Sequence, residues 1–142
     1  MSEARDEILV RMANRLEEIE RLSTAIEAFV AKHDLPDSVA FAFNLSLDEL
    51  VTNVILYAFP DVQDHTIDVR LRLEGGMLHA ELSDDGRPFD PLSVPPPNLD
   101  APIEERRIGG LGIHIVREMM DTLSYAREGD KNVLRLGKRV AP

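Results

Sequence analysis

The sequence predicts an α+β fold: a two-layer α/β sandwich with a mixed, mainly antiparallel sheet of about five strands, covered on one face by three helices. Three observations lead to this prediction. Short segments alternate between apolar and polar residues, as half-buried strands do, and longer segments space apolar residues as helices do. Glycine-containing turns join neighbouring strands into hairpins. The length of 142 residues fits one domain, residues 1–142.

The first predicted elements are a strand and a helix. Residues 6–12 alternate between apolar and polar side chains, which indicates a strand. Asn14 is expected to cap the following helix, with Glu17 at the capping-box position three residues later. Apolar residues then recur at helical spacing as far as His33.

The second helix is predicted to be the central one. Pro36 suits its first turn, and the helix is expected to run to about Phe59, where Pro60 stops it. Apolar residues cover most of its circumference. Such a helix is buried in a core and does not lie at the surface.

The C-terminal half begins with a hairpin, in which residues 66–73 and 77–82 form strands around Gly75 and Gly76. Residues 85–108 are proline-rich and have no periodicity, and a long structureless loop of this kind is usually a functional lid or disordered. A third helix is expected after Gly112. The last two strands are predicted at residues 122–127 and 133–138.

Composition narrows the classes of function. The net charge of −10 argues against nucleic acid as a partner, because phosphate binding needs a basic surface. The absence of cysteine excludes thiolate metal sites, disulfides and thiol catalysis. No apolar run reaches the roughly 18 residues of a membrane span, and the N-terminus lacks the order of a signal peptide. We therefore expect a cytoplasmic protein with no nucleic-acid or membrane partner.

Glu49 and Asn53 lie one turn apart in the second helix, so their side chains project from the same face. In one interpretation, Asn53 offers an oxygen to Mg²⁺, a hard ion that also binds substrate phosphates. Glu49 would then take a proton from an attacking hydroxyl or water. In the alternative, the two residues form a narrow solvated stripe with Asp48 and Thr52. The pair alone leaves both interpretations open.

Asp84 ends a predicted strand and precedes Asp85 and Gly86. An ionised carboxylate only accepts hydrogen bonds, so Asp84 could receive the exocyclic amine of adenine. Gly86 would let the base approach the backbone without a Cβ in the way. An ordinary Asp-Gly turn at the end of a strand is the alternative.

Gly109, Gly110 and Gly112 precede the third helix, where backbone N–H groups and the helix dipole could hold an anion. Arg106 and Arg107, just before them, could reach a terminal phosphate, although such a pair is often simply exposed. The alternative for the glycines is a flexible joint. The chain contains no Walker loop and no Gly-x-Gly-x-x-Gly dinucleotide pattern after a strand.

These features in this order are much rarer than each alone, and they indicate ATP. The residues resemble the GHKL (Bergerat-fold) superfamily of ATPases and kinases, and within it the bacterial serine-kinase anti-sigma factors of partner-switching systems. Glu49-x-x-x-Asn53 is similar to the N box of that superfamily, Asp84-x-Gly86 to its first glycine box, and Gly110-x-Gly112 to its second. The resemblance covers nearly the whole chain.

The resemblance implies a role for each of these residues. Glu49 would be the catalytic base, and Asn53 would hold Mg²⁺ between the phosphates of ATP. Asp84 would bind the adenine amine above Gly86, while Gly110 and Gly112 would shape the phosphate-binding lid. Many relatives carry a threonine in the penultimate strand that helps to bind the base. This chain has Gly129-Asp-Lys-Asn-Val133 there, so Asn132 is the candidate substitute.

The implied activity is transfer of a phosphoryl group from ATP to a serine of a small antagonist (anti-anti-sigma) protein. The kinase would bind either that antagonist or a sigma factor or similar regulator. Two alternatives are a non-catalytic ATP-binding module that sequesters a partner, and a detached histidine-kinase catalytic domain. Relatives often pair, so a homodimer is possible, with Leu22, Ile26 and Phe29 serving either an interface or the core.

Overall fold

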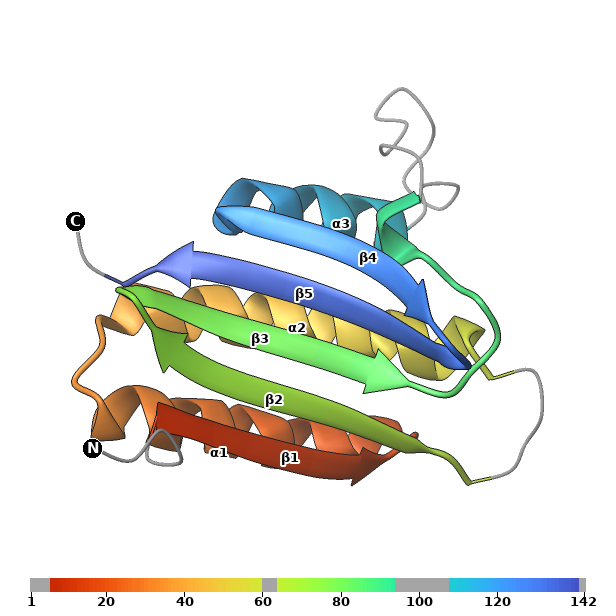
Figure 1. Cartoon of the computed structure of the whole chain (residues 1–142), viewed down its shortest axis with the longest axis horizontal. Coiled ribbons are helices and arrows are strands. Elements are labelled where there is room, and N and C mark those ends of the chain that lie inside the picture. The colour runs from red at the N-terminus through yellow and green to blue at the C-terminus, as the bar shows by residue number, and fades with distance from the viewer. Residues whose placement is uncertain (1–5, 60–63, 94–107, 141–142) are drawn as a thin grey trace.

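The computed structural model describes residues 6–59, 64–93 and 108–140, with the backbone alone for residues 108–111. Five strands form one sheet in the order β1-β2-β3-β5-β4 (Figure 1). The strands are β1 (Glu7–Ala13), β2 (Thr66–Glu74), β3 (Met77–Asp84), β4 (Thr122–Glu128) and β5 (Lys131–Arg139). Every neighbouring pair is antiparallel, so the mainly antiparallel sheet is confirmed, without the parallel pairing that a mixed sheet would contain.

Three helices cover one face of this sheet (Figure 1). They are α1 (Ile19–Lys32), α2 (Asp37–Tyr57) and α3 (Ile108–Met119). Short 3-10 turns occur at Leu16–Glu18 and Pro91–Ser93. The predicted α+β fold with two layers is therefore confirmed.

Alternation along the strands explains how the two layers join. In β3 every second residue is buried, from Leu78 to Asp84, and these side chains face the helices. The other face of the sheet lies open and bears cross-strand ion pairs such as Arg135 with Glu81, whose Nε–Oε2 distance is 3.0 Å. Because side chains on a strand point to opposite faces in turn, Asp84 is placed on the helix side with the core.

Helix α2 is the central helix, as predicted. Its buried residues include Phe43, Leu47 and Leu50, each 0% exposed. By length and apolar composition, α2 would also pass as a membrane span, although half of its most apolar stretch is buried in this fold. Burial against the sheet and against α1 and α3 accounts for its apolar character.

The side chains of Leu22, Ile26 and Phe29 on α1 are buried within the single chain, with exposures of 1%, 1% and 2%. Their apolar character is thus explained by the core. An interface between two copies would have to use other residues.

The predicted start of the first helix is wrong. Asn14 does not cap α1: its Oδ1 accepts a hydrogen bond from the backbone N–H of His65 at 3.0 Å, which joins it to the start of β2. Glu18, not Glu17, reaches back to a backbone N–H, that of Ala13, at 3.0 Å. Helical structure accordingly begins after Arg15.

The third helix also begins earlier than predicted. It starts at Ile108, so Gly109, Gly110 and Gly112 are helical and do not form a loop ahead of the helix. Glycine lowers helix propensity by about 1 kcal/mol relative to alanine, but tertiary packing routinely outweighs such preferences. Ile113 and Val116, on the buried side of α3, supply that packing with exposures of 2% and 1%.

Candidate functional site

Helix α2 brings Glu49 and Asn53 together, as their spacing predicts. The Nδ2 of Asn53 donates a hydrogen bond to Glu49 Oε2 at 3.0 Å. Asn53 is only 4% exposed, and Glu49 is half-buried beside it. A solvated stripe, the alternative interpretation, would leave Asn53 exposed. The structure places this side chain inside the protein.

Gly112 of α3 faces this pair. A Cβ at position 112 would overlap the carboxylate of Glu49, including Cδ and both oxygens. A side chain at position 112 would therefore force the flexible end of Glu49 to move. Gly110 lies in the first turn of α3, where only the backbone is described.

Asp84 and Gly86 form a second cluster at the end of β3. The backbone N–H of Gly86 donates to Asp84 Oδ1 at 2.8 Å. A Cβ at Gly86 would lie 2.9 Å from both Asp84 Oδ1 and Ala58 Cβ. The structural reason for glycine here is thus the packing of this turn against the end of α2, whereas the sequence suggested room for a base.

Helix α2 links the two clusters. Glu49 and Asn53 lie within it, and the acidic turn attaches at its C-terminal end, where the backbone N–H of Arg87 donates to Ala58 O at 2.8 Å. Positions 49 and 58 are separated by about 14 Å of helical rise, at 1.5 Å per residue. The predicted residues are therefore arranged along one helix, with Gly112 beside its middle and Gly86 against its end.

Two oxygens of this site have no hydrogen-bond donor within the described ranges. Both bonds to Asp84 go to Oδ1, from Gly86 N and from Asn132 Nδ2, which leaves Oδ2 unused. Asn53 uses Nδ2 toward Glu49, which leaves its Oδ1 unused. Asp84 is only 2% exposed. Neither oxygen is among the fully buried unpaired atoms of the described residues, so both are open to solvent or to a ligand.

The electrostatics of both carboxylates follow from burial. Burial raises the pKa of Glu49, the hydrogen bond from Asn53 opposes that rise, and the negative charge of Asp48 adds to it. Burial likewise raises the pKa of Asp84, and the hydrogen bonds from Asn132 and Gly86 oppose it. Perturbed carboxylates in one site are typical of functional residues.

Sequence reasoning missed most of the residues that hold Asp84. Asn132 is the cross-strand partner of both Asp84 and Arg127, so the three form a row across β3, β5 and β4. Arg127 Nη1 donates to Gly86 O at 2.8 Å and to Asn132 Oδ1 at 3.2 Å. Only the register of the strands reveals this row, and register depends on pairings between residues far apart in the chain.

The donor set fits a magnesium ion that binds mainly through a nucleotide. No group of three or more His, Cys, Asp or Glu side chains in the described segments could hold a metal by itself. Asn53 Oδ1 could supply one hard oxygen ligand, and Mg²⁺ usually takes its remaining ligands from phosphates and water. Arg106 and Arg107 lie outside the described residues, as does most of the proline-rich lid.

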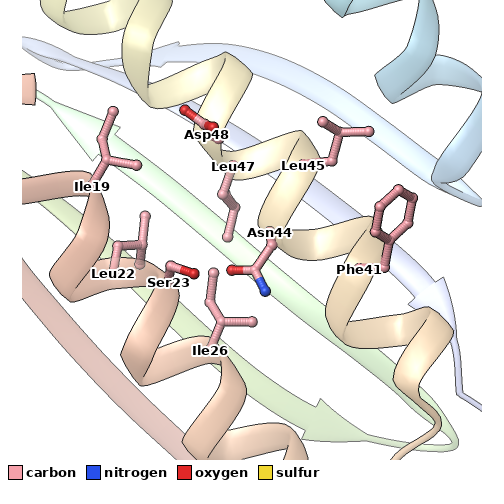
Figure 2. A pocket seen from close by; sticks show the side chains of 9 residues that line it. All are labelled: Ile19, Leu22, Ser23, Ile26, Phe41, Asn44, Leu45, Leu47 and Asp48. Atoms are coloured by element: carbon pink, nitrogen blue, oxygen red, sulfur yellow. The ribbon is translucent and has the colours of Figure 1, made fainter.

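A separate hollow of about 240 Å³ lies between α1 and α2 (Figure 2). None of the predicted site residues lines it, although Asp48 immediately precedes Glu49. Its lining is mostly apolar: Ile19, Leu22, Ser23, Ile26, Phe41, Asn44, Leu45, Leu47 and Asp48. The hollow is therefore distinct from the site along α2.

The structure is thus a two-layer α+β domain with two polar clusters along α2. Comparison with known proteins then identifies the family: residues 12–138 match the histidine kinase-like ATPase domain. The chain belongs to this family, which is the superfamily that the motifs resemble. The predicted fold and family are thereby confirmed.

Several relatives share sequence with this chain. Serine/threonine-protein kinase BtrW of Bordetella bronchiseptica is 29% identical over 102 residues, which are 72% of each protein. Serine-protein kinase RsbW of Listeria innocua is 30% identical over 90 residues, which are 60% of this chain and 57% of that protein. The chain therefore spans less than two thirds of the length of RsbW.

A solved structure agrees in fold. The RsbU and RsbW domains of Rv1364c from Mycobacterium tuberculosis match with a TM-score of 0.69 and 14% identity. The match covers 96% of this chain and 33% of that one. At this identity the likeness concerns the fold alone.

Proposed function

We propose that this chain is an ATP-dependent protein serine kinase of the partner-switching type. It phosphorylates a serine on a small antagonist protein and sequesters a sigma-like regulator when the antagonist is phosphorylated. Similarity to proteins named serine-protein kinases supports the activity. The single structural observation behind the proposal is the half-buried Glu49 carboxylate, held by Asn53 against the α3 backbone at Gly112.

In this proposal each unused oxygen has a ligand. Asp84 Oδ2 accepts a hydrogen bond from the exocyclic amine of adenine. Asn53 Oδ1 would hold Mg²⁺, which would neutralise the charge of the phosphates. Gly110 and Gly112 bring the start of α3 close to the phosphates, where its N-terminal dipole favours negative charge.

Glu49 acts as the base of the transfer step. The serine oxygen of the antagonist forms a bond to the γ-phosphorus, and the bond from that phosphorus to the β–γ bridging oxygen breaks. The serine proton passes to Glu49, and ADP leaves with the bonding electron pair. Asn53 holds Glu49 Oε2, so Oε1 is the oxygen available for the proton. Positioning and charge neutralisation supply most of the acceleration in such transfers.

The partners follow from this activity. They are the antagonist and a sigma factor or another regulator, in a cytoplasmic setting, with no nucleic acid or membrane involved. A net charge of −10 favours basic surfaces on both partners. Pairing of two copies is compatible with the proposal, but the reaction does not require it.

Calorimetry and phosphotransfer test the proposal together. Mg-ADP and Mg-ATP should bind with a measurable heat at a stoichiometry of about one. A pull-down with a non-hydrolysable ATP analogue should then recover a small protein, and labelled ATP should label one of its serines. The matched control is Glu49→Gln, which should bind nucleotide but transfer no phosphate.

Two results would favour the alternative functions. Nucleotide binding and partner capture without any phosphoprotein would indicate a binding module that uses ATP only to hold a conformation. Acid-labile phosphate on the product would indicate a histidine-kinase catalytic domain acting in trans. Acid-stable phosphoserine excludes both.

A further inference from the structure

Asn132 occupies the middle of the row that crosses β3, β5 and β4 beneath the acidic turn. It pairs directly with Asp84 on one side and with Arg127 on the other. Its side chain is 3% exposed. The sequence suggested Asn132 as a substitute for the threonine that helps related proteins to bind the base, directly or through water.

The hydrogen bonds of Asn132 leave its carboxamide no free donor for a direct contact to the base. Its Nδ2 donates to Asp84 Oδ1 at 3.0 Å and to Arg87 O at 2.8 Å. Its Oδ1 accepts from Phe89 N at 3.1 Å, from Arg127 Nη1 at 3.2 Å and from Tyr125 OH. A carboxamide has two N–H donors and two acceptor lone pairs, so this one is fully used.

The same hydrogen bonds determine which oxygen of Asp84 can still accept a hydrogen bond from a ligand. Oδ1 receives Asn132 Nδ2 and Gly86 N, at 3.0 and 2.8 Å. Two donors on one oxygen fix the rotation of the carboxylate. Asp84 Oδ2 therefore remains as an acceptor, and its direction is fixed by the hydrogen bond from Asn132 on β5.

We propose that Asn132 is a positioning residue for nucleobase selectivity. It holds Asp84 so that one carboxylate oxygen alone meets the base. That oxygen accepts a hydrogen bond from an exocyclic amine, as in adenine, but opposes the carbonyl oxygen that guanine presents at the same position. This inference depends on the proposed nucleotide site and adds the residue that would make the site selective for its base.

The charges around Asp84 define a pH test. They are Asp85 in its own turn, Arg127 from β4 and Arg87, three residues after Asp84, while His65, just before β2, contacts Asp85 at 3.3 Å. In the wild type, protonation of Asp84 removes the acceptor, so affinity for ADP falls as the pH is lowered.

Asn132→Asp should reverse this dependence of ADP affinity on pH. The substitution is isosteric, and it retains the acceptor while replacing both donors with oxygen. At neutral pH two carboxylates then face each other and Asp84 loses its alignment. At lower pH a proton shared between them restores the bridge, as for other close carboxylate pairs. Affinity for ADP should therefore rise on acidification.

The experiment is calorimetric titration with Mg-ADP and Mg-GDP between pH 5.5 and 8, all on a His65→Gln background that removes the nearby histidine. Loss of a hydrogen bond to a charged group should weaken ADP binding about 10- to 100-fold at neutral pH, with little change for GDP. Val133→Ala, a buried neighbour on β5 whose side chain faces away from Asp84, should alter neither the ADP-to-GDP ratio nor the pH dependence.

Asn132→Ser provides a second variant if the aspartate does not fold. It shortens the donor, so it should lower the ADP-to-GDP ratio about fivefold, the equivalent of one ordinary hydrogen bond. If the wild type binds Mg-ADP and both variants keep its ratio and pH dependence, the inference is overturned while the proposed function stands. If the wild type binds neither nucleotide, both are overturned.

Discussion

The carboxylate of Glu49 lies against the backbone of Gly112, in the space that a Cβ at position 112 would fill. This contact joins α2 to the second turn of α3. A glycine that the sequence associates with the phosphate-binding lid is thereby also the residue that makes room for the proposed base.

Gly112→Ala should therefore reduce phosphotransfer without unfolding the protein. The new methyl group must displace the Glu49 carboxylate, and a shift of 1 Å in a catalytic group can cost about 100-fold in rate. Alanine is also a better helix former than glycine, by about 1 kcal/mol, which opposes the cost of displacing Glu49. The thermal stability should therefore change little.

The measurement is the single-turnover rate of antagonist labelling, together with a thermal melt. His114→Ala, on the exposed side of α3, is the control and should transfer at the wild-type rate. A wild-type rate for Gly112→Ala would mean that the position of Glu49 does not affect phosphotransfer.

Glu49→Gln tests the base itself and its pH dependence. Loss of a general base should slow transfer about 10²- to 10⁴-fold, while nucleotide binding is retained. Because burial raises the pKa of Glu49, the wild-type rate should fall on acidification at a pH above the ordinary glutamate value of about 4.3. The variant should not show this fall in rate. The same fall in both proteins would mean that another group titrates.

The sequence was sufficient to predict most of this fold, because its signals are local. Alternation identifies every strand within a few residues, and the apolar circumference of α2 marks it as the central helix. The spacing of Glu49 and Asn53 places them on one face for the same reason.

Where the sequence failed, non-local contacts decided the outcome. Asn14 looks like a helix cap, but it bonds to His65, which is 51 residues away. The glycines before Ile113 look like a loop, but packing of α3 against α2 keeps them helical. The row of Asp84, Asn132 and Arg127 depends on strand register, and its members are up to 48 residues apart.

Asp84→Asn should separate stability from binding. Burial raises the pKa of Asp84 in the folded state, so its contribution to stability is fully present below the unfolded pKa and is lost as the pH rises through the folded pKa. At neutral pH the ionised carboxylate therefore destabilises the fold, and a neutral asparagine should raise the free energy of unfolding.

The same variant should lose adenine binding, because an amide N–H₂ in place of Oδ2 opposes the exocyclic amine of the base. A fall of about 10- to 100-fold in ADP affinity is expected. Urea unfolding at pH 4 and pH 7 with matched calorimetry measures both effects. Asp85→Asn, which changes an exposed carboxylate, is the comparison. Undiminished ADP binding by Asp84→Asn would remove Asp84 from the site.

Asn53→Ala tests whether Asn53 binds magnesium, because the effects of this substitution and of metal removal should not add. The variant removes Asn53 Oδ1, which no described residue uses, so affinity for Mg-ADP should fall at least about tenfold, or 1.4 kcal/mol. Chelating the metal should weaken ADP binding by the wild type to a similar level. Chelation should then have little further effect on the variant, because both changes remove the same interaction. Thr52→Ala, one residue away, should keep the full response to chelator, whereas an equal response in Asn53→Ala would place the metal elsewhere.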